Sequence, residues 1–108
     1  MSIGDIRSKL LDAFNVMALS PKPLQGRLAD AYRIGIETID ADYLRDEQRR
    51  LFEFVASRLA PNSGKSVEEV CSELSEDDAA TIAMRLKMLF EGVDNAWIAF
   101  RLAEKRAA

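Results

Sequence analysis

The sequence predicts an all-α protein: a bundle of four main helices plus one short helix, with a long C-terminal helix. Apolar residues recur in steps of three and four along the 108-residue chain, which is the spacing of one helical face. Serines followed three positions later by an acidic residue stand before several of these stripes, as at helix N-termini. No strand-like alternation competes with them. The length suits one modest core, so we expect residues 1–108 to form a single helical domain.

The first two helices are expected over about 2–19 and 23–39. Ser2 and Asp5 resemble a capping box in which Asp replaces the usual Glu. Two prolines then end the first helix, because a residue before proline avoids the helical region. Gly35 lies on the apolar stripe of the second helix, which indicates a close approach by a neighbouring helix.

The third helix is expected over about 41–60, with Asp40 or Asp42 as its N-cap. One side of this segment carries mixed charge, and the opposite side is apolar. A Pro-Asn-Ser-Gly run at 61–64 is the clearest loop in the chain. The predicted core face of the third helix consists of Leu44, Leu51, Phe52, Val55 and Leu59.

A short fourth helix is expected over about 67–74, because Ser66 and Glu69 form a capping box. Ser75 opens the longest helix, expected over about 76–105. Its main stripe repeats every seven residues, a spacing typical of packed helices. The core residues predicted from this stripe are Leu86, Phe90, Val93, Trp97 and Phe100.

The last helix also carries apolar residues on its opposite side, at Met84, Met88, Ile98 and Leu102. A helix that is apolar on two faces must bury both or expose one. Two interpretations follow: the helix lies at the centre of the monomer, or its second face pairs with another chain. Methionine suits adaptable binding surfaces, so these four residues are the candidate interaction site.

Composition excludes several chemistries. The chain has no His, one Cys and a net charge of −3. Catalytic systems that need imidazole are therefore impossible, nearly every zinc site is removed, and no internal disulfide can form. Cys71 is expected to be a buried hydrophobe, and a Gly-Lys-Ser run at 64–66 lacks the earlier glycine of a phosphate-binding loop. We expect no catalysis, no cofactor and no metal.

Nucleic-acid binding is disfavoured. Residues 26–46 fit a helix-turn-helix loosely, but the segment that would enter the groove, 38–46, carries three Asp and one Arg. Residues 68–78 hold six acidic side chains and no basic one, which would repel phosphate. This acidic run is either a pair of solvated helix ends or a docking patch for a basic partner.

No secretory signal and no apolar run of membrane-spanning length occur, so a cytoplasmic protein without a membrane segment is expected. The favoured function is a helical module that acts by protein–protein contact, with a protein partner or as a homodimer. One alternative is a DNA-binding transcriptional regulator with a degenerate helix-turn-helix. Another is a small-molecule binder with an apolar pocket between helices, around Phe90 and Trp97.

Overall fold

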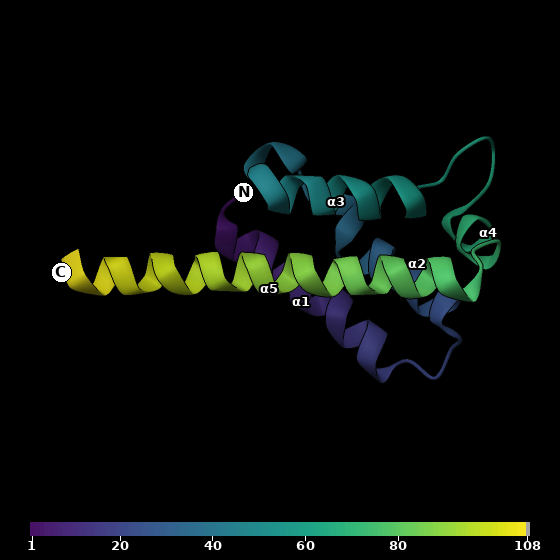
Figure 1. Ribbon diagram of the computed structural model, residues 1–108, viewed down its shortest axis with the longest axis horizontal. Coiled ribbons are helices and arrows are strands. Elements are labelled where there is room, and N and C mark those ends of the chain that lie inside the picture. The colour runs from purple at the N-terminus through teal and green to yellow at the C-terminus, as the bar shows by residue number, and fades with distance from the viewer. Residues whose placement is uncertain (108) are drawn as a thin grey trace.

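A computed structural model describes residues 1–107 and shows helices joined by short connections (Figure 1). Two 3-10 turns separate the second and third α-helices, and residues 1–107 contain no β-strand, only an isolated bridge between Asn62 and Lys65. This confirms an all-α fold of four main helices and one short helix. The elements are α1 (Ile3–Leu19), α2 (Leu24–Ile34), η1 (Ile36–Thr38), η2 (Ala41–Tyr43), α3 (Asp46–Leu59), α4 (Val67–Ser72) and α5 (Glu76–Ala107).

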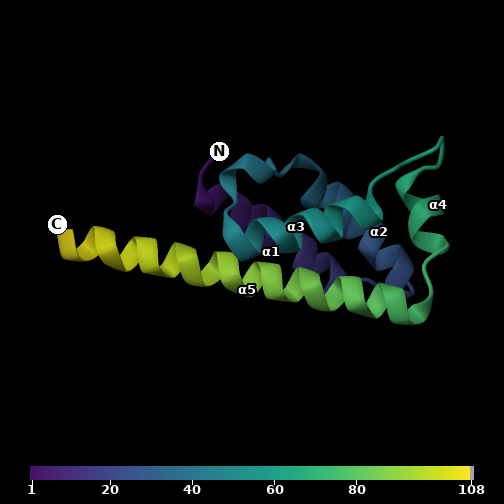
Figure 2. The same ribbon diagram turned by 45° about the horizontal axis from the view of Figure 1, so that its top comes forward.

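The longest helix, α5, spans the whole molecule, which measures 50 × 27 × 20 Å (Figure 1). It packs against α1 and α3, and α2 packs behind against α1, α4 and α5. The view in Figure 2 places α5 along one edge of the assembly, with the other helices on one side of it. One side of α5 therefore faces the body, and the other faces outwards.

The core lies where these helices meet, and every fully buried position in residues 1–107 is apolar or glycine. All five residues expected on the core face of the third helix are buried, although Leu44 lies before α3. The largest fully buried side chains are Ile6, Leu10, Leu28, Ile36, Val55, Leu59, Cys71, Ile82, Leu86, Leu89 and Val93.

Gly35 allows the end of α2 to lie directly against α1. A Cβ atom at this position would clash with the carbonyl oxygen of Lys9 and would approach the Cβ of Ala13 to 3.2 Å. Backbone cannot yield as a flexible side chain does, so only glycine fits here. The close approach expected from the sequence is confirmed.

The expected helix starts are also present. The Ser2 backbone N–H donates to the Asp5 carboxylate (2.9 Å), and the Asp5 N–H donates to the Ser2 hydroxyl (3.2 Å). Ser66 and Glu69 form the same reciprocal pair at the start of α4. At the start of α5, the Asp78 N–H donates to the hydroxyl of Ser75 (3.0 Å).

The long second and third helices expected from the sequence are wrong between residues 35 and 45. There α2 stops at Ile34, two 3-10 turns follow, and α3 begins only at Asp46, whose φ is 52°. Asp40 does cap a helical turn, but it is η2, through the Asp42 N–H. The irregular path buries Ile36, Ile39 and Leu44 against the core, and this tertiary packing stabilises it in place of a continuous helix.

The predicted stripe of α5 is correct only as far as Val93. Leu86 and Val93 are buried and Phe90 is half-buried, stacked on Phe14 with ring centroids 5.4 Å apart. Beyond them Trp97 is half-buried, and Phe100, expected in the core, is 52% exposed. The physical reason is that α5 continues past the other helices, so nothing in the described chain covers its last turns (Figure 1).

Candidate interaction surface

The outer face of α5 carries the four residues singled out in the sequence. Their exposed fractions are 57% for Met84, 39% for Met88, 43% for Ile98 and 49% for Leu102. Helical spacing puts all four opposite the buried stripe of α5, and Met84 and Met88 also border hollows shared with α1 and α3. The interpretation in which α5 is buried on all sides of the monomer is therefore wrong for this face.

This face is not apolar along its whole length. Glu91 and Asn95 lie on it between Met88 and Ile98, and both are exposed. The six positions are separated by four, three, four, three and four residues, which is the spacing of one continuous seam along a helix. We name the outer seam for Met84, Met88, Glu91, Asn95, Ile98 and Leu102.

The flanks of the outer seam are held by contacts within the chain. On one flank, Asp94 pairs with Arg7 of α1 at 2.6 Å. On the other flank, Gly92 faces Gln48 of α3, whose Nε2 would lie 3.2 Å from an added Cβ. Gln48 therefore fills the space beside Gly92. From the flank, Lys87 reaches towards Glu91 of the seam, with 3.9 Å between nitrogen and oxygen.

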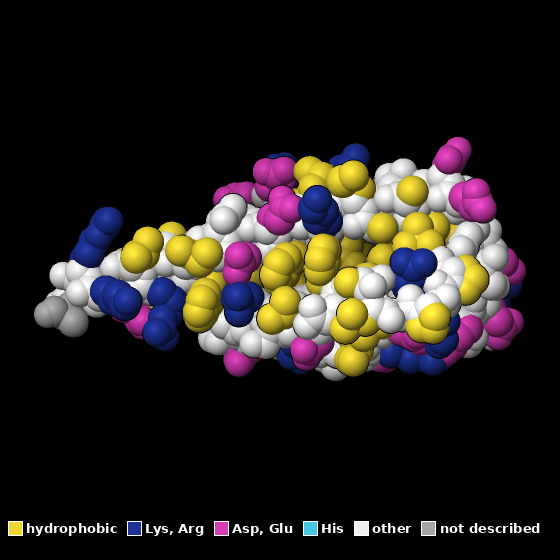
Figure 3. All heavy atoms as spheres, turned by 90° about the horizontal axis from the view of Figure 1, so that it is seen from below, with side chains coloured by type: hydrophobic (Ala, Val, Ile, Leu, Met, Phe, Trp, Pro, Cys, Tyr) yellow, Lys and Arg dark blue, Asp and Glu magenta, His cyan; other side chains and the backbone are white. Residues whose placement is uncertain are grey.

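Residues 98–107, all of them exposed, form a C-terminal overhang in the part of α5 that projects beyond the body of the molecule (Figure 1). Trp97 closes the body at this point: the Arg7 guanidinium lies 4.6 Å from its ring centroid, and Gly4 of α1 lies against its indole nitrogen. Arg101 covers the same ring at 5.5 Å. Figure 3 shows hydrophobic side chains both on the projecting end and along the body.

An apolar hollow of about 390 Å³ lies between α1 and α5, beside the outer seam. Phe14, Met17, Ala83 and Met84 line it, and Lys87 stands at its edge. The sequence suggested a pocket around Phe90 and Trp97, whereas this hollow lies beside Phe14, the ring on which Phe90 stacks. It adds apolar surface next to one end of the seam.

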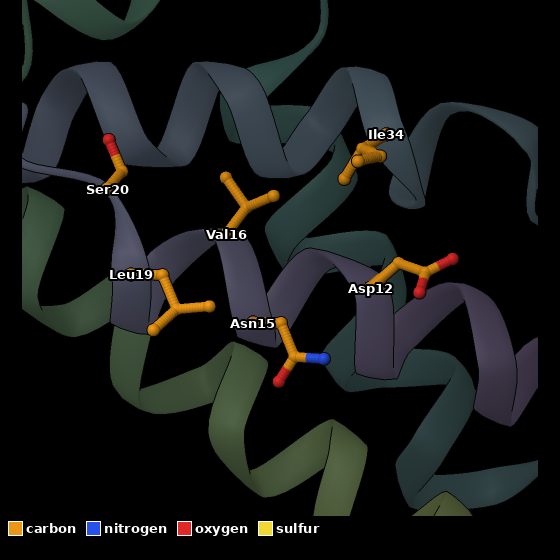
Figure 4. Close-up of a pocket in the computed structure, with 6 residues that line it drawn as sticks. All are labelled: Asp12, Asn15, Val16, Leu19, Ser20 and Ile34. Carbon is orange, nitrogen blue, oxygen red and sulfur yellow. The ribbon is translucent and has the colours of Figure 1, made fainter.

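A second hollow, of about 380 Å³, lies between α1 and α2 (Figure 4). Leu19 and Ile34 line it and are 82% and 52% exposed, and Asp12 and Asn15 form its polar side. Sequence reasoning missed this place, because each of these two apolar residues ends its helix and stands off the main stripe. Large apolar residues at the ends of predicted helices are the sequence signal for this hollow.

Ion pairs neutralise part of the negative charge of residues 68–78. Glu68 pairs with Arg33 of α2, and Lys65 donates to Glu73 at 2.7 Å. The Glu69 carboxylate accepts the backbone N–H of Ser66 in the capping box. The other exposed acidic side chains of this run are those in the first turn of α5. Negative charge there is favourable at a helix N-terminus.

The thiol of Cys71 is buried. Burial raises its pKa above the ordinary value, and Arg33 opposes this rise, so the reactive thiolate form is disfavoured. Within residues 1–107 no three potential ligand side chains are grouped to hold a metal ion. No helix in the same range is long and apolar enough to cross a membrane.

The segment that would serve as a DNA-recognition helix does not form one. Residues 38–46 contain the end of η1, the turn η2 and extended backbone before α3. Comparisons with known proteins add no assignment: no family model, no curated sequence and no solved structure matches the chain.

Proposed function

We propose that the protein is a helical module that acts by protein–protein contact, and that the outer seam of α5 is its binding surface. The observation that supports this is the alignment of four large, exposed apolar side chains on one face of one helix. Single exposed apolar residues are ordinary on protein surfaces, whereas several large ones gathered on one helix face mark a candidate interaction site.

Magnitudes support a contact that needs more than these four side chains. Full burial of one such side chain contributes about 1.5–3 kcal/mol, and each is already about half covered. Association costs about 4–15 kcal/mol in lost freedom. The hollow between α1 and α5 supplies further apolar surface beside Met84.

Site-specific photo-crosslinking in the cells of origin tests this function. A photoreactive side chain at position 88 or 98 is expected to give protein adducts, because both positions lie on the outer seam. The matched control is position 57, an exposed site on α3 away from the seam. Equal adducts at positions 57 and 88, or none at 88 and 98, would contradict the proposal.

A double variant provides the complementary test. Met88→Glu with Ile98→Lys is expected to remain helical by circular dichroism, because both side chains are exposed, and to lose the adducts at a reporter placed at position 84. Ser57→Glu is the matched charge change on α3 and is expected to keep them. A folded double variant with unchanged adducts would show that the seam is not the binding surface.

Binding of an apolar small molecule is a second candidate, favoured by the hollow between α1 and α5. Its volume of about 390 Å³ falls within the range of ligand pockets, about 300–1,000 Å³, and its walls are mostly apolar. Ala83→Phe would fill it. Loss of binding of a fluorescent apolar probe in that variant, with the fold retained, would support this candidate.

A further inference from the structure

The spacing of the six positions of the outer seam is the same in both directions along α5. Its six positions are separated by four, three, four, three and four residues, so the pattern is symmetric about residue 93. If a second α5 lies antiparallel across that centre, Met84 meets Leu102 of the partner subunit and Met88 meets Ile98 of the partner subunit. Glu91 then meets Asn95 of the partner subunit. Apolar positions oppose apolar ones, and polar positions oppose polar ones.

We propose that the partner is a second copy of this chain, with the two α5 helices antiparallel and in register about residue 93; this rests on the proposed function of the outer seam. The alternating steps of three and four are those of a two-helix seam. Across it, the Asn95 amide donates to the carboxylate of Glu91 of the partner subunit, since an amide donates and a carboxylate only accepts.

Other arrangements of the two helices are worse matched. A parallel pair places Glu91 against its own copy, so two carboxylates oppose each other. A slip by seven residues in the antiparallel pair puts Met84 against Asn95 and Met88 against Glu91. A polar layer inside an apolar seam is a known means of specifying one register.

The charges of the two ends of α5 also favour the antiparallel arrangement. The first turn carries Glu76, Asp77 and Asp78, and the last turn carries Lys105 and Arg106. Antiparallel packing brings each acidic end to a basic end, at both ends of the pair. Residues 96–108 carry a net charge of +2, against −5 on residues 1–95.

At the symmetry centre Asp94 comes near its own copy, and each is paired with Arg7 in its own chain. On the same flank, Lys87 comes near Arg101 of the partner subunit. Each has an acidic or aromatic contact in its own chain: Lys87 reaches towards Glu91, and Arg101 lies over the Trp97 ring. Their repulsion is therefore reduced without new partners.

The antiparallel pair also covers the exposed apolar side chains of the overhang. Because the symmetry centre is residue 93, the exposed Ile98 and Leu102 lie over the first half of the partner's α5, where the body supports it. Leu102 then lies beside the hollow lined by Met84, Phe14 and Met17 of the other copy. A stable dimer buries about 1,200 Å² or more in total. A seam of six positions needs flanking contacts, such as this one at the hollow, to reach that area.

Disulfide trapping of two single-cysteine variants tests the register. Met84→Cys and Leu102→Cys are each expected to give little disulfide dimer alone and at least about tenfold more when mixed. In the antiparallel pair the two copies of position 84 are eighteen residues apart along the seam, or about 27 Å, too far for a disulfide. The unmodified chain is the blank, because Cys71 is buried.

Phe100→Cys is the matched control. Phe100 is as exposed as Leu102 but lies on the opposite side of α5, so its mixture with Met84→Cys is expected to stay unlinked. Linking of Met84→Cys to itself, or equal linking of the Phe100→Cys mixture, would overturn the antiparallel register while leaving contact through α5 intact.

Two substitutions at one position test the polar layer by sedimentation. Asn95→Glu opposes Glu91 of the partner subunit and is expected to weaken dimerisation at least about tenfold, whereas Asn95→Lys is expected to retain it. Equal effects would overturn the layer. A wild-type chain that is monomeric at about 1 mM, near the weak limit of specific affinity, would overturn the second copy as partner. Photo-adducts to a different protein would in that case leave the proposed function standing.

Discussion

The two halves of α5 share one repeating stripe but have opposite surroundings. In the first half, Ala79, Leu86 and Val93 are at most 1% exposed. Seven residues later Phe100, on the same stripe, is 52% exposed. The comparison teaches that a seven-residue repeat defines the side of a helix that is suited to burial, and that a neighbouring element must still reach it.

The lengths of the neighbouring helices decide where burial stops. The body is built on α1 and α3, of 17 and 14 residues, whereas α5 has 32 residues and is about 48 Å long. The first turn of α1 meets Trp97, and no element of the described chain continues beyond it. Trp97 thus marks the boundary between the two halves.

The largest expected difference lies between equivalent truncations in the two halves. Leu89→Ala should lower the free energy of unfolding by about 2–5 kcal/mol, because Leu89 is fully buried and a cavity results. Phe100→Ala should change it by no more than about 0.5 kcal/mol, as for an exposed site. Urea denaturation followed by circular dichroism measures both. Equal losses would mean that the overhang is packed in the monomer.

Phe90→Ala should have an intermediate effect, about 1–3 kcal/mol, because Phe90 is half-buried and stacked on Phe14. A double-mutant cycle with Phe14→Ala isolates the stacking contribution, expected at about 0.5–1.5 kcal/mol. A coupling of zero would show that the rings contribute only through their separate burial.

Arg7→Ala should weaken the contact between α1 and Trp97 and lower the free energy of unfolding by about 1 kcal/mol. The change removes a hydrogen bond to Asp94 and packing on Trp97 at a partly exposed site. Trp97 is the only tryptophan, so its fluorescence reports the change directly as a shift to longer wavelength. Arg7→Lys keeps the charge without the planar guanidinium and is expected to recover only part of the packing. Full recovery with Lys would mean that charge alone matters.

Deletion of residues 100–108 should leave the stability of the monomer within about 0.5 kcal/mol, because the deleted turns contact little of the body. Association should fall at least about tenfold, because Leu102 and the basic end are lost together. Thermal denaturation at low protein concentration and sedimentation at high concentration measure the two effects separately. A truncated chain that melts much earlier would show that the overhang supports the fold.

The smallest expected effect is a pH dependence of the contact between Trp97 and the first turn of α1. Hydrogen bonds from Ser2, backbone first and then hydroxyl, lower the pKa of Asp5 below its ordinary value of 3.8. The stabilisation is therefore complete above about pH 4 and is lost as the pH falls through the lowered pKa. Trp97 fluorescence of the native protein should follow this loss, and Asp5→Asn should abolish the dependence. Unchanged behaviour in Asp5→Asn would assign it to another carboxylate.

Much of the fold follows from local signals in the sequence. The capping pairs Ser2–Asp5 and Ser66–Glu69 join residues three positions apart, so the pattern alone predicts them. The place of Gly35 on an apolar stripe predicts a close approach, whereas only the structure shows that the neighbour is Lys9 of α1. The interruption at 35–45 does not follow in this way. It depends on where Ile36, Ile39 and Leu44 find the core, which is a property of the assembled helices.

By itself, the sequence determined that the protein is all-α, that α5 is the longest helix, and that this helix is apolar on two sides. Periodicity and capping chemistry act within a few residues, so these features need no knowledge of neighbours. Only the tertiary structure decided which side of α5 is covered, that Gly92 faces Gln48, and that the stripe is buried at Val93 but exposed at Phe100. Burial is a relation between elements distant in sequence, and it ends where the shorter helices end.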